Sequence, residues 1–225
     1  MTPTSGRHGV LFDVDGTLVD TAYLHAVCWW EAFRQHGRRV PMPALGRAIG
    51  MGSDVLIEHV LGETPVDADE ISAAHSVLYR TYWQRLQPLP GARELVAACA
   101  DRGVPVVLAS SAKQDDLAEM RRVLDCDDYI TAATSSADVS ASKPHPDLIG
   151  AALEAARLQA AGSVFVGDSV WDVEAAGRAD VPCIGVASGV FSQQELADAG
   201  AIATYADPHD LVAHLTESPI GHIVG

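Results

Sequence analysis

Short runs of apolar residues recur along the chain, and between most of them apolar residues fall at helical spacing. The runs are continuous rather than alternating, which is typical of strands buried on both faces of a sheet. We predict five such strands and one further edge strand, at His8–Phe12, Val104–Ala109, Tyr129–Ala133, Val164–Val166, Cys183–Ala187 and Ile202–Tyr205. The helical patterns cover Glu94–Ala100, Asp116–Leu124, Asp147–Leu158, Asp172–Arg178 and a last segment near Leu211–Leu215. This alternation predicts an α/β fold with a parallel sheet and right-handed crossovers.

The connection after the first predicted strand breaks this rhythm. It contains no convincing strand, and its amphipathic patterns predict helices over Ala22–His36 and Ser72–Leu86. Its length of about seventy residues is far more than one crossover requires. We therefore predict an inserted helical cap over residues 19–88, with a catalytic core formed by residues 1–18 and 89–225.

Composition and charge narrow the class of protein. The net charge of −15 argues against nucleic acid and anionic membranes as partners. No run of eighteen apolar residues occurs, and the opening MTPTSGRHG lacks the pattern of a signal peptide, so we expect a cytoplasmic protein. The four cysteines are scattered and form no C-x-x-C pair, which favours isolated thiols over a metal site or disulfides.

Polar residues stand where several predicted strands end. Ligands of an open parallel sheet bind at the carboxyl ends of its strands, so these residues are expected to converge. They are Asp13 and Asp15 after the first strand, Ser110 after the second, Lys143 before the fourth and Asp168 at the end of the fourth. Carboxylates, a hydroxyl and a lysine suit a magnesium ion and a phosphoryl group. Lysine is otherwise scarce, with only Lys113 besides Lys143.

The two carboxylates of the first motif suggest different roles. Asp13, at the end of the strand, can meet a metal and attack phosphorus as a nucleophile. Gly16 allows a sharp turn, so Asp15 can lie above the site as general acid and base. A calcium-binding loop is excluded, because Leu18 and Leu24 stand where an EF-hand requires Gly and Glu.

Four motifs in this order resemble the haloacid dehalogenase-like superfamily, in its branch of phosphoglycolate phosphatases and β-phosphoglucomutases. The resemblance covers nearly the whole chain and implies a Rossmann-like, doubly wound core with a helical cap inserted after the first strand. The motifs are Asp13-Val14-Asp15-Gly16-Thr17-Leu18, Ser110, Lys143-Pro144, and Gly167-Asp168-Ser169 with Asp172.

The resemblance also implies the roles of these residues. Asp13 would become an aspartyl-phosphate, and Asp15 would protonate the leaving group and then activate water. Ser110 and Lys143 would bind the transferring phosphoryl group. The cofactor would be Mg²⁺, held by Asp13, the backbone carbonyl of Asp15, and Asp168, with Asp172 as a closer or water-mediated ligand.

Five further residues are candidates for substrate binding, each with a structural alternative. Lys113 and Ser111 follow the second motif, where Lys113 can equally begin a solvated helix. His25 lies on the first cap helix, where its side chain either faces the cleft or packs within the helical cap. Arg47 and Gly50 lie in a cap loop; Arg47 suits an anionic substrate tail, and Gly50 equally suits a turn.

These features favour a magnesium-dependent phosphatase that acts on a small phosphorylated metabolite, such as a sugar phosphate or phosphoglycolate. The presence of Asp15 and the absence of lysine from the cap distinguish the chain from dehalogenases and phosphonoacetaldehyde hydrolases. Gly167 stands where β-phosphoglucomutases usually have Glu, which argues against mutase activity. A phosphosugar mutase is the alternative function within the superfamily. A phospho-accepting or binding module without turnover is the alternative from a different class. We expect a monomer or a weak homodimer.

Overall fold

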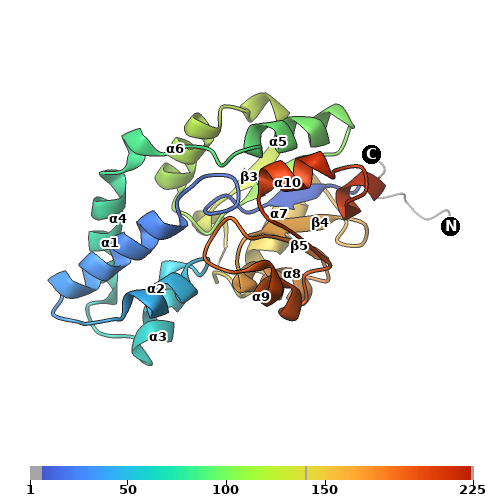
Figure 1. Cartoon of the computed structure of the whole chain (residues 1–225). Coiled ribbons are helices and arrows are strands. Elements are labelled where there is room, and N and C mark those ends of the chain that lie inside the picture. The colour runs from blue at the N-terminus through green and yellow to red at the C-terminus, as the bar shows by residue number, and fades with distance from the viewer. Residues whose placement is uncertain (1–6, 140, 224–225) are drawn as a thin grey trace.

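The larger lobe of the molecule is built around one sheet of six parallel strands (Figure 1). The computed structural model describes residues 7–139 and 141–223; the first six residues, part of the segment examined for a signal peptide, lie outside this range. The strand order is β3-β2-β1-β4-β5-β6, and every neighbouring pair is parallel. The strands are β1 (Val10–Phe12), β2 (Val106–Ala109), β3 (Ile130–Thr134), β4 (Val164–Gly167), β5 (Cys183–Val186) and β6 (Ala203–Tyr205). This order is that of a doubly wound Rossmann-like sheet, so the predicted fold class is confirmed.

Alternate residues of the central strands face opposite layers of helices. Val10 and Phe12 face a core with α5, α6 and α10, whereas Leu11 faces a second core with α7, α8 and α9. Both faces of these strands are therefore apolar, as their continuous apolar runs predicted. The helices are α5 (Ala92–Asp101), α6 (Gln114–Leu124), α7 (Asp147–Ala156), α8 (Val170–Arg178), α9 (Gln193–Asp198) and α10 (Pro208–Ala213), with short 3₁₀ turns η2 (Asp127–Tyr129), η3 (Ser136–Asp138) and η4 (Pro219–His222).

Two details of the expected elements are corrected by the structure. Strand β3 is only partly buried, because it lies at the edge of the sheet, so its expected burial on both faces was wrong. The long helix expected over Ser72–Leu86 is two elements, α4 (Ala68–Arg80) and η1 (Trp83–Arg85). At the end of α4, the Thr81 hydroxyl donates to the Leu78 carbonyl at 2.7 Å.

The second lobe is helical and has its own apolar core. It comprises α1 (Ala22–Gln35), α2 (Met42–Ala48) and α3 (Ser53–Leu61) together with α4 and η1. Trp29, Phe33 and Ile71 are among its buried residues. The chain enters and leaves side by side, since the Asp20 amide donates to the Gln87 carbonyl at 3.0 Å. The boundaries of the cap at residues 19 and 88 stay a prediction.

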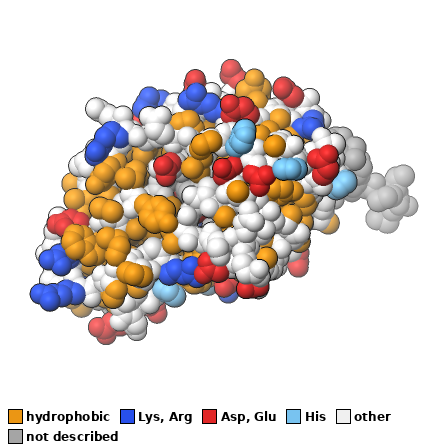
Figure 2. Space-filling view, viewed as in Figure 1, with side chains coloured by type: hydrophobic (Ala, Val, Ile, Leu, Met, Phe, Trp, Pro, Cys, Tyr) orange, Lys and Arg blue, Asp and Glu red, His pale blue; other side chains and the backbone are white. Residues whose placement is uncertain are grey.

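Hydrophobic side chains gather on the outer face of this helical lobe around α1 (Figure 2). Tyr23 and Val27 of α1 are among the exposed ones. None of the helices in the described part of the chain combines the length and hydropathy needed to span a membrane. The oligomeric state stays a prediction.

Gly91 offers a test of how tightly the core is closed where the chain returns from the cap. It caps α5 with φ +77°, and a Cβ there would overlap the backbone of His209. Gly103 has φ +76° but open space around it. We expect Gly103→Ala to cost about 1 kcal/mol of unfolding free energy from backbone strain alone, and Gly91→Ala at least about 2 kcal/mol. Urea denaturation of the two variants measures the difference, and equal losses would contradict the close packing inferred at Gly91.

Candidate active site

A tight turn after β1 presents the two carboxylates of the first motif. Phe12 of β1 is in register with Leu108 of β2 and with Val166 of β4. The residues that follow these strands therefore meet at one edge of the sheet. Gly16 adopts φ +78°, and a Cβ there would overlap the carboxylate of Asp168. Glycine is therefore required for both the turn and the close approach of Asp168.

Three acidic residues form a buried cluster at this edge. Asp13, Asp168 and Asp172 each offer a carboxylate oxygen within 4.8 Å of the others. The Thr17 hydroxyl lies between two of them, 3.1 Å from Asp168 Oδ1 and 3.2 Å from Asp13 Oδ2. Asp172 also accepts from the backbone amide of Ser169 at 3.0 Å in a capping box at the start of α8, which fixes it toward β1.

The Lys143 ammonium group is buried within this cluster. It donates to Asp13 Oδ1 and forms an ion pair with Asp172 Oδ1 at 2.7 Å. Burial raises the pKa of Asp13 to about 7, although Lys143 opposes this shift. Burial, with repulsion from Asp172 and Asp13, likewise raises the pKa of Asp168 well above its ordinary value.

This arrangement fits a divalent cation. Three buried carboxylates face a single ammonium group, so the site carries more negative than positive charge when they are ionised. Carboxylate oxygens are also the ligands that Mg²⁺ prefers. Asp13, Asp168 and Asp172 are the residues that can hold such an ion.

Asp15 points away from the cluster and toward the helical lobe. Its Oδ1 accepts from the Thr21 hydroxyl at 2.8 Å and lies 2.9 Å from His25 Nε2 on α1. Burial acts to raise the pKa of Asp15, but His25 and Thr21 outweigh it and lower the pKa below its ordinary value. Ser110 lies 3.4 Å from Asp15 Oδ2, at the end of β2. The side chain of Asp15 thus lies outside the acidic cluster and has a histidine and a threonine as its partners.

His25 is itself held by a second histidine. Its Nδ1 lies 3.1 Å from Nε2 of His75 on α4, and its ring stacks on Tyr79. His75 is buried, and burial lowers its pKa well below the ordinary value. Both nitrogens of His25 are therefore engaged, with Asp15 on one side and His75 on the other.

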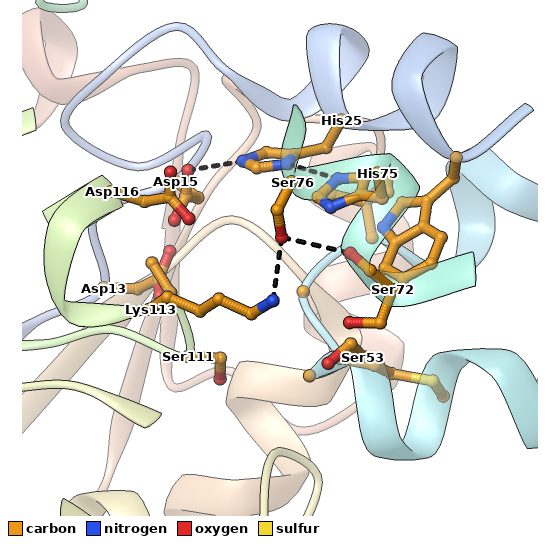
Figure 3. A pocket seen from close by; sticks show the side chains of 16 residues that line it. Asp13, Asp15, His25, Ser53, Ser72, His75, Ser76, Ser111, Lys113 and Asp116 are labelled. Carbon is orange, nitrogen blue, oxygen red and sulfur yellow. Dashed lines mark hydrogen bonds and ion pairs between the residues drawn. The ribbon is translucent and has the colours of Figure 1, made fainter. Parts of the chain in front are cut away.

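A pocket lies between the sheet edge and the helical lobe (Figure 3). Five of the expected substrate-binding and catalytic side chains reach it together with Gly50. Lys113 extends across it, and its Nζ donates to Ser76 Oγ on α4 at 2.8 Å. The lining consists of Asp13, Asp15, His25, Trp29, Ile49, Gly50, Met51, Gly52, Ser53, Ser72, His75, Ser76, Ser111, Ala112, Lys113 and Asp116.

Arg47 is the exception among the residues expected to bind the substrate. Its side chain is absent from the described lining of the pocket. The guanidinium instead lies 4.2 Å from the centre of the Phe191 ring and pairs with Glu195 at 2.7 Å. The structure therefore places Arg47 in a contact between α2 and the sheet lobe, outside the described lining of the pocket, and its contact with a substrate tail stays a prediction.

Several lining residues were missed by the sequence analysis. Three of them, Ser72, His75 and Ser76, lie on one face of α4, and Asp116 lies in the first turn of α6. A signal was present, because polar residues at positions i, i+3 and i+4 interrupt the apolar face of an amphipathic helix. Assigning them to the pocket required knowing where α4 lies.

Comparison with known proteins gives a consistent result. The model of the family described as haloacid dehalogenase-like hydrolase matches residues 10–186. The phosphoglycolate phosphatase of Yersinia pestis is 33% identical over 220 residues, covering 93% of this chain and 90% of that protein. The crystal structure of a hydrolase from Pseudomonas syringae has 31% identity and a TM-score of 0.89, covering 94% of this chain and 98% of that one.

A more distant solved structure extends the similarity of fold. The β-phosphoglucomutase of Clostridium difficile has a TM-score of 0.82 at 16% identity, covering 96% of this chain and 97% of that one. The motifs, the strand order and the family match agree, so the resemblance noted in the sequence is confirmed. The chain belongs to the haloacid dehalogenase-like hydrolases.

Proposed function

We propose that this enzyme is a magnesium-dependent phosphatase that hydrolyses a small phosphate monoester through an aspartyl-phosphate. The observation that carries the proposal is the division between two carboxylates on one turn. Asp13 lies in the acidic cluster against Lys143, whereas Asp15 is held by His25 beside the pocket. A nucleophile and a separate acid/base group are the two parts that two-step phosphoryl transfer requires.

Each residue has a distinct part in the reaction. The Asp13 carboxylate attacks phosphorus, while Lys143 offsets its charge and Ser110 orients the phosphoryl group. Asp15 gives a proton to the departing oxygen, then takes one from the water that cleaves the aspartyl-phosphate. The first step starts from the protonated form of Asp15 and leaves it as a carboxylate. His25 lowers the pKa of Asp15 and so favours this carboxylate, the form that accepts a proton from the attacking water in the second step.

The metal and the substrate are held by different groups. Mg²⁺ would be bound by Asp13, Asp168, Asp172 and the Asp15 carbonyl, and would supply positive charge against the transferring phosphoryl group. Lys113 and Ser111 line the pocket further out and suit the leaving group.

The relatives support a phosphatase acting on a small substrate. The name phosphoglycolate phosphatase belongs to proteins 30–33% identical to this chain, so phosphoglycolate is one candidate and a sugar phosphate is the other. The mutase comparison is limited to the fold, since identity there is 16%. The acid/base Asp15 argues against a module that only stores phosphate, because such a module needs no leaving-group acid.

The first prediction from the proposed function concerns turnover. Asp13→Asn should lower phosphate release from a panel of small monoesters by about 10³-fold or more, because the amide is not a nucleophile. EDTA should abolish release from the native enzyme, and excess Mg²⁺ should restore it. The exposed Asp128→Asn variant serves as control. A long-lived phosphoprotein without turnover would instead identify a phospho-accepting module, and isomerised bisphosphate sugars would identify a mutase.

The second prediction concerns pH and metal binding. The folded pKa of Asp13 is about 7 against an ordinary 3.8, so between these values the metal-free fold holds a proton that the unfolded chain releases. Raising the pH through this window removes that stabilising contribution. Mg²⁺ competes with the same proton, so the rise in Tm on adding Mg²⁺ should grow between about pH 5.5 and about pH 8. Comparing Tm with and without Mg²⁺ at each pH cancels titrations that the metal does not affect. An increment that is constant with pH would contradict this linkage.

The third prediction concerns His25. His25→Leu should lower kcat by about 10²-fold with a smaller change in KM, because Asp15 loses its partner while the outer pocket remains. His25→Gln can still donate an N–H toward Asp15 and should recover part of that loss. Steady-state kinetics of both variants tests this. Equal loss in the two variants would assign His25 to packing alone.

A further inference from the structure

Asp116 is a buried carboxyl group in the pocket that the proposed mechanism does not use. It is 6% exposed, and its Oδ1 has no accessible surface and no hydrogen-bond partner among the described residues. Figure 3 shows it beside Asp15 in the lining of the pocket. A buried carboxyl oxygen without a donor costs about 1–3 kcal/mol, so its retention calls for a reason.

A structural role in the helix does not supply that reason. Asp116 is the third residue of α6, where an acidic side chain can bond the amide of the residue that caps the helix. The cap residue is Lys113, and no such side-chain bond is made there. The favourable position near the start of the helix requires no burial, because the neighbouring Asp115 has the same benefit while exposed.

The surroundings of Asp116 match the place of a leaving group. Its charge interacts with Asp15, the proposed proton donor to the departing oxygen, and with His25. Lys113 lies further along the pocket, where it reaches Ser76. A group attached next to the ester oxygen that Asp15 protonates would therefore lie near Asp116.

We infer that Asp116 is a specificity-determining residue that accepts a hydrogen bond from a hydroxyl group close to the scissile ester. This inference rests on the proposed function and narrows its substrate to polyol or sugar phosphates. A substrate hydroxyl group can donate a hydrogen bond to the unpartnered Oδ1 of Asp116. A substrate carboxylate at the same place would be repelled by the Asp116 carboxyl group in a buried site. The serine hydroxyls of Ser53, Ser72 and Ser76 add neutral polar partners on the opposite wall.

A donor from the protein itself is the rival explanation. The indole N–H of Trp83 on η1 lies close enough to Asp116 to act toward a lower pKa of its carboxyl group, although burial raises that pKa overall. The geometry falls short of a hydrogen bond, since the indole N–H, Asp116 Oδ1 and the Tyr79 hydroxyl are all buried without a partner among the described residues. A small movement of the helical lobe could bring Trp83 onto Asp116. In that case the hydrogen bonding of Asp116 would depend on the position of the helical lobe, and Asp116 would not discriminate between substrates.

Two esters of equal length distinguish a substrate hydroxyl group from Trp83 as the hydrogen-bond donor to Asp116. 2-Hydroxyethyl phosphate and phosphoglycolate differ only in carrying CH₂OH or a carboxylate beside the ester carbon. We expect native enzyme with Mg²⁺ to favour the hydroxyl ester in kcat/KM, and Asp116→Asn to lower that ratio by about tenfold or more. Asp128→Asn and Trp83→Phe should leave the ratio unchanged.

Other results would overturn the inference. The inference fails if Asp116→Asn leaves the ratio unchanged, or if Trp83→Phe shifts the ratio as much as Asp116→Asn does. It also fails if the native enzyme prefers phosphoglycolate and Asp116→Asn loses that preference. If neither ester is hydrolysed, the panel of monoesters still tests the proposed function separately, and binding tests Asp116. The thermal shift given by the hydroxyl ester should then exceed that given by phosphoglycolate in the native chain and not in Asp116→Asn. Equal shifts in the native chain would reject the assignment.

Discussion

The buried ammonium group of Lys143 is the charge on which the active site depends. Asp13, Asp168 and Asp172 lie so close together that their mutual repulsion and burial oppose ionisation. Lys143 contacts two of the three and is the only lysine or arginine classed as buried among the described residues. Removing one partner from such a buried group leaves an uncompensated charge, which is strongly destabilising. The residual negative charge is what makes the site suitable for a divalent cation.

The parallel sheet explains why these charges can meet at all. The central strand β1 has β2 on one side and β4 on the other, with their ends level. Residues 155 positions apart, such as Asp13 and Asp168, are then brought to one edge by backbone pairing alone. The apolar cores pack against both faces of the sheet behind that edge. Within the turn after β1, Gly16 is the residue with a left-handed backbone conformation. Precise placement of reactive groups thus follows from the strands rather than from the loops.

Much of this could be predicted from the sequence because it depends on local pattern. Continuous apolar runs predicted the strands, and carboxylates directly after β1 and at the end of β4 predicted the convergence of Asp13 and Asp168. What could not be predicted depends on the placement of the helical lobe. Arg47 has the same character in sequence as a substrate-binding arginine, yet Glu195, 148 positions later, determines where it lies. The contact of His25 with both Asp15 and His75 likewise needs α1 and α4 side by side.

In the proposed mechanism, the helical lobe therefore takes part in the chemistry as well as in covering the site. Asp15 belongs to the sheet lobe, but the pKa of its carboxyl group is lowered by His25 from α1. His25 is in turn oriented by His75 from α4, whose burial keeps it neutral and able to bond without adding charge. If α1 and α4 moved away, Asp15 would lose this partner while Asp13 and Lys143 stayed paired. The proposed nucleophile thus has its partners in the sheet lobe alone, whereas the proposed acid/base group has its full set of partners only when both lobes are in contact. In the proposed mechanism, such a separation would link proton transfer to closure over a substrate.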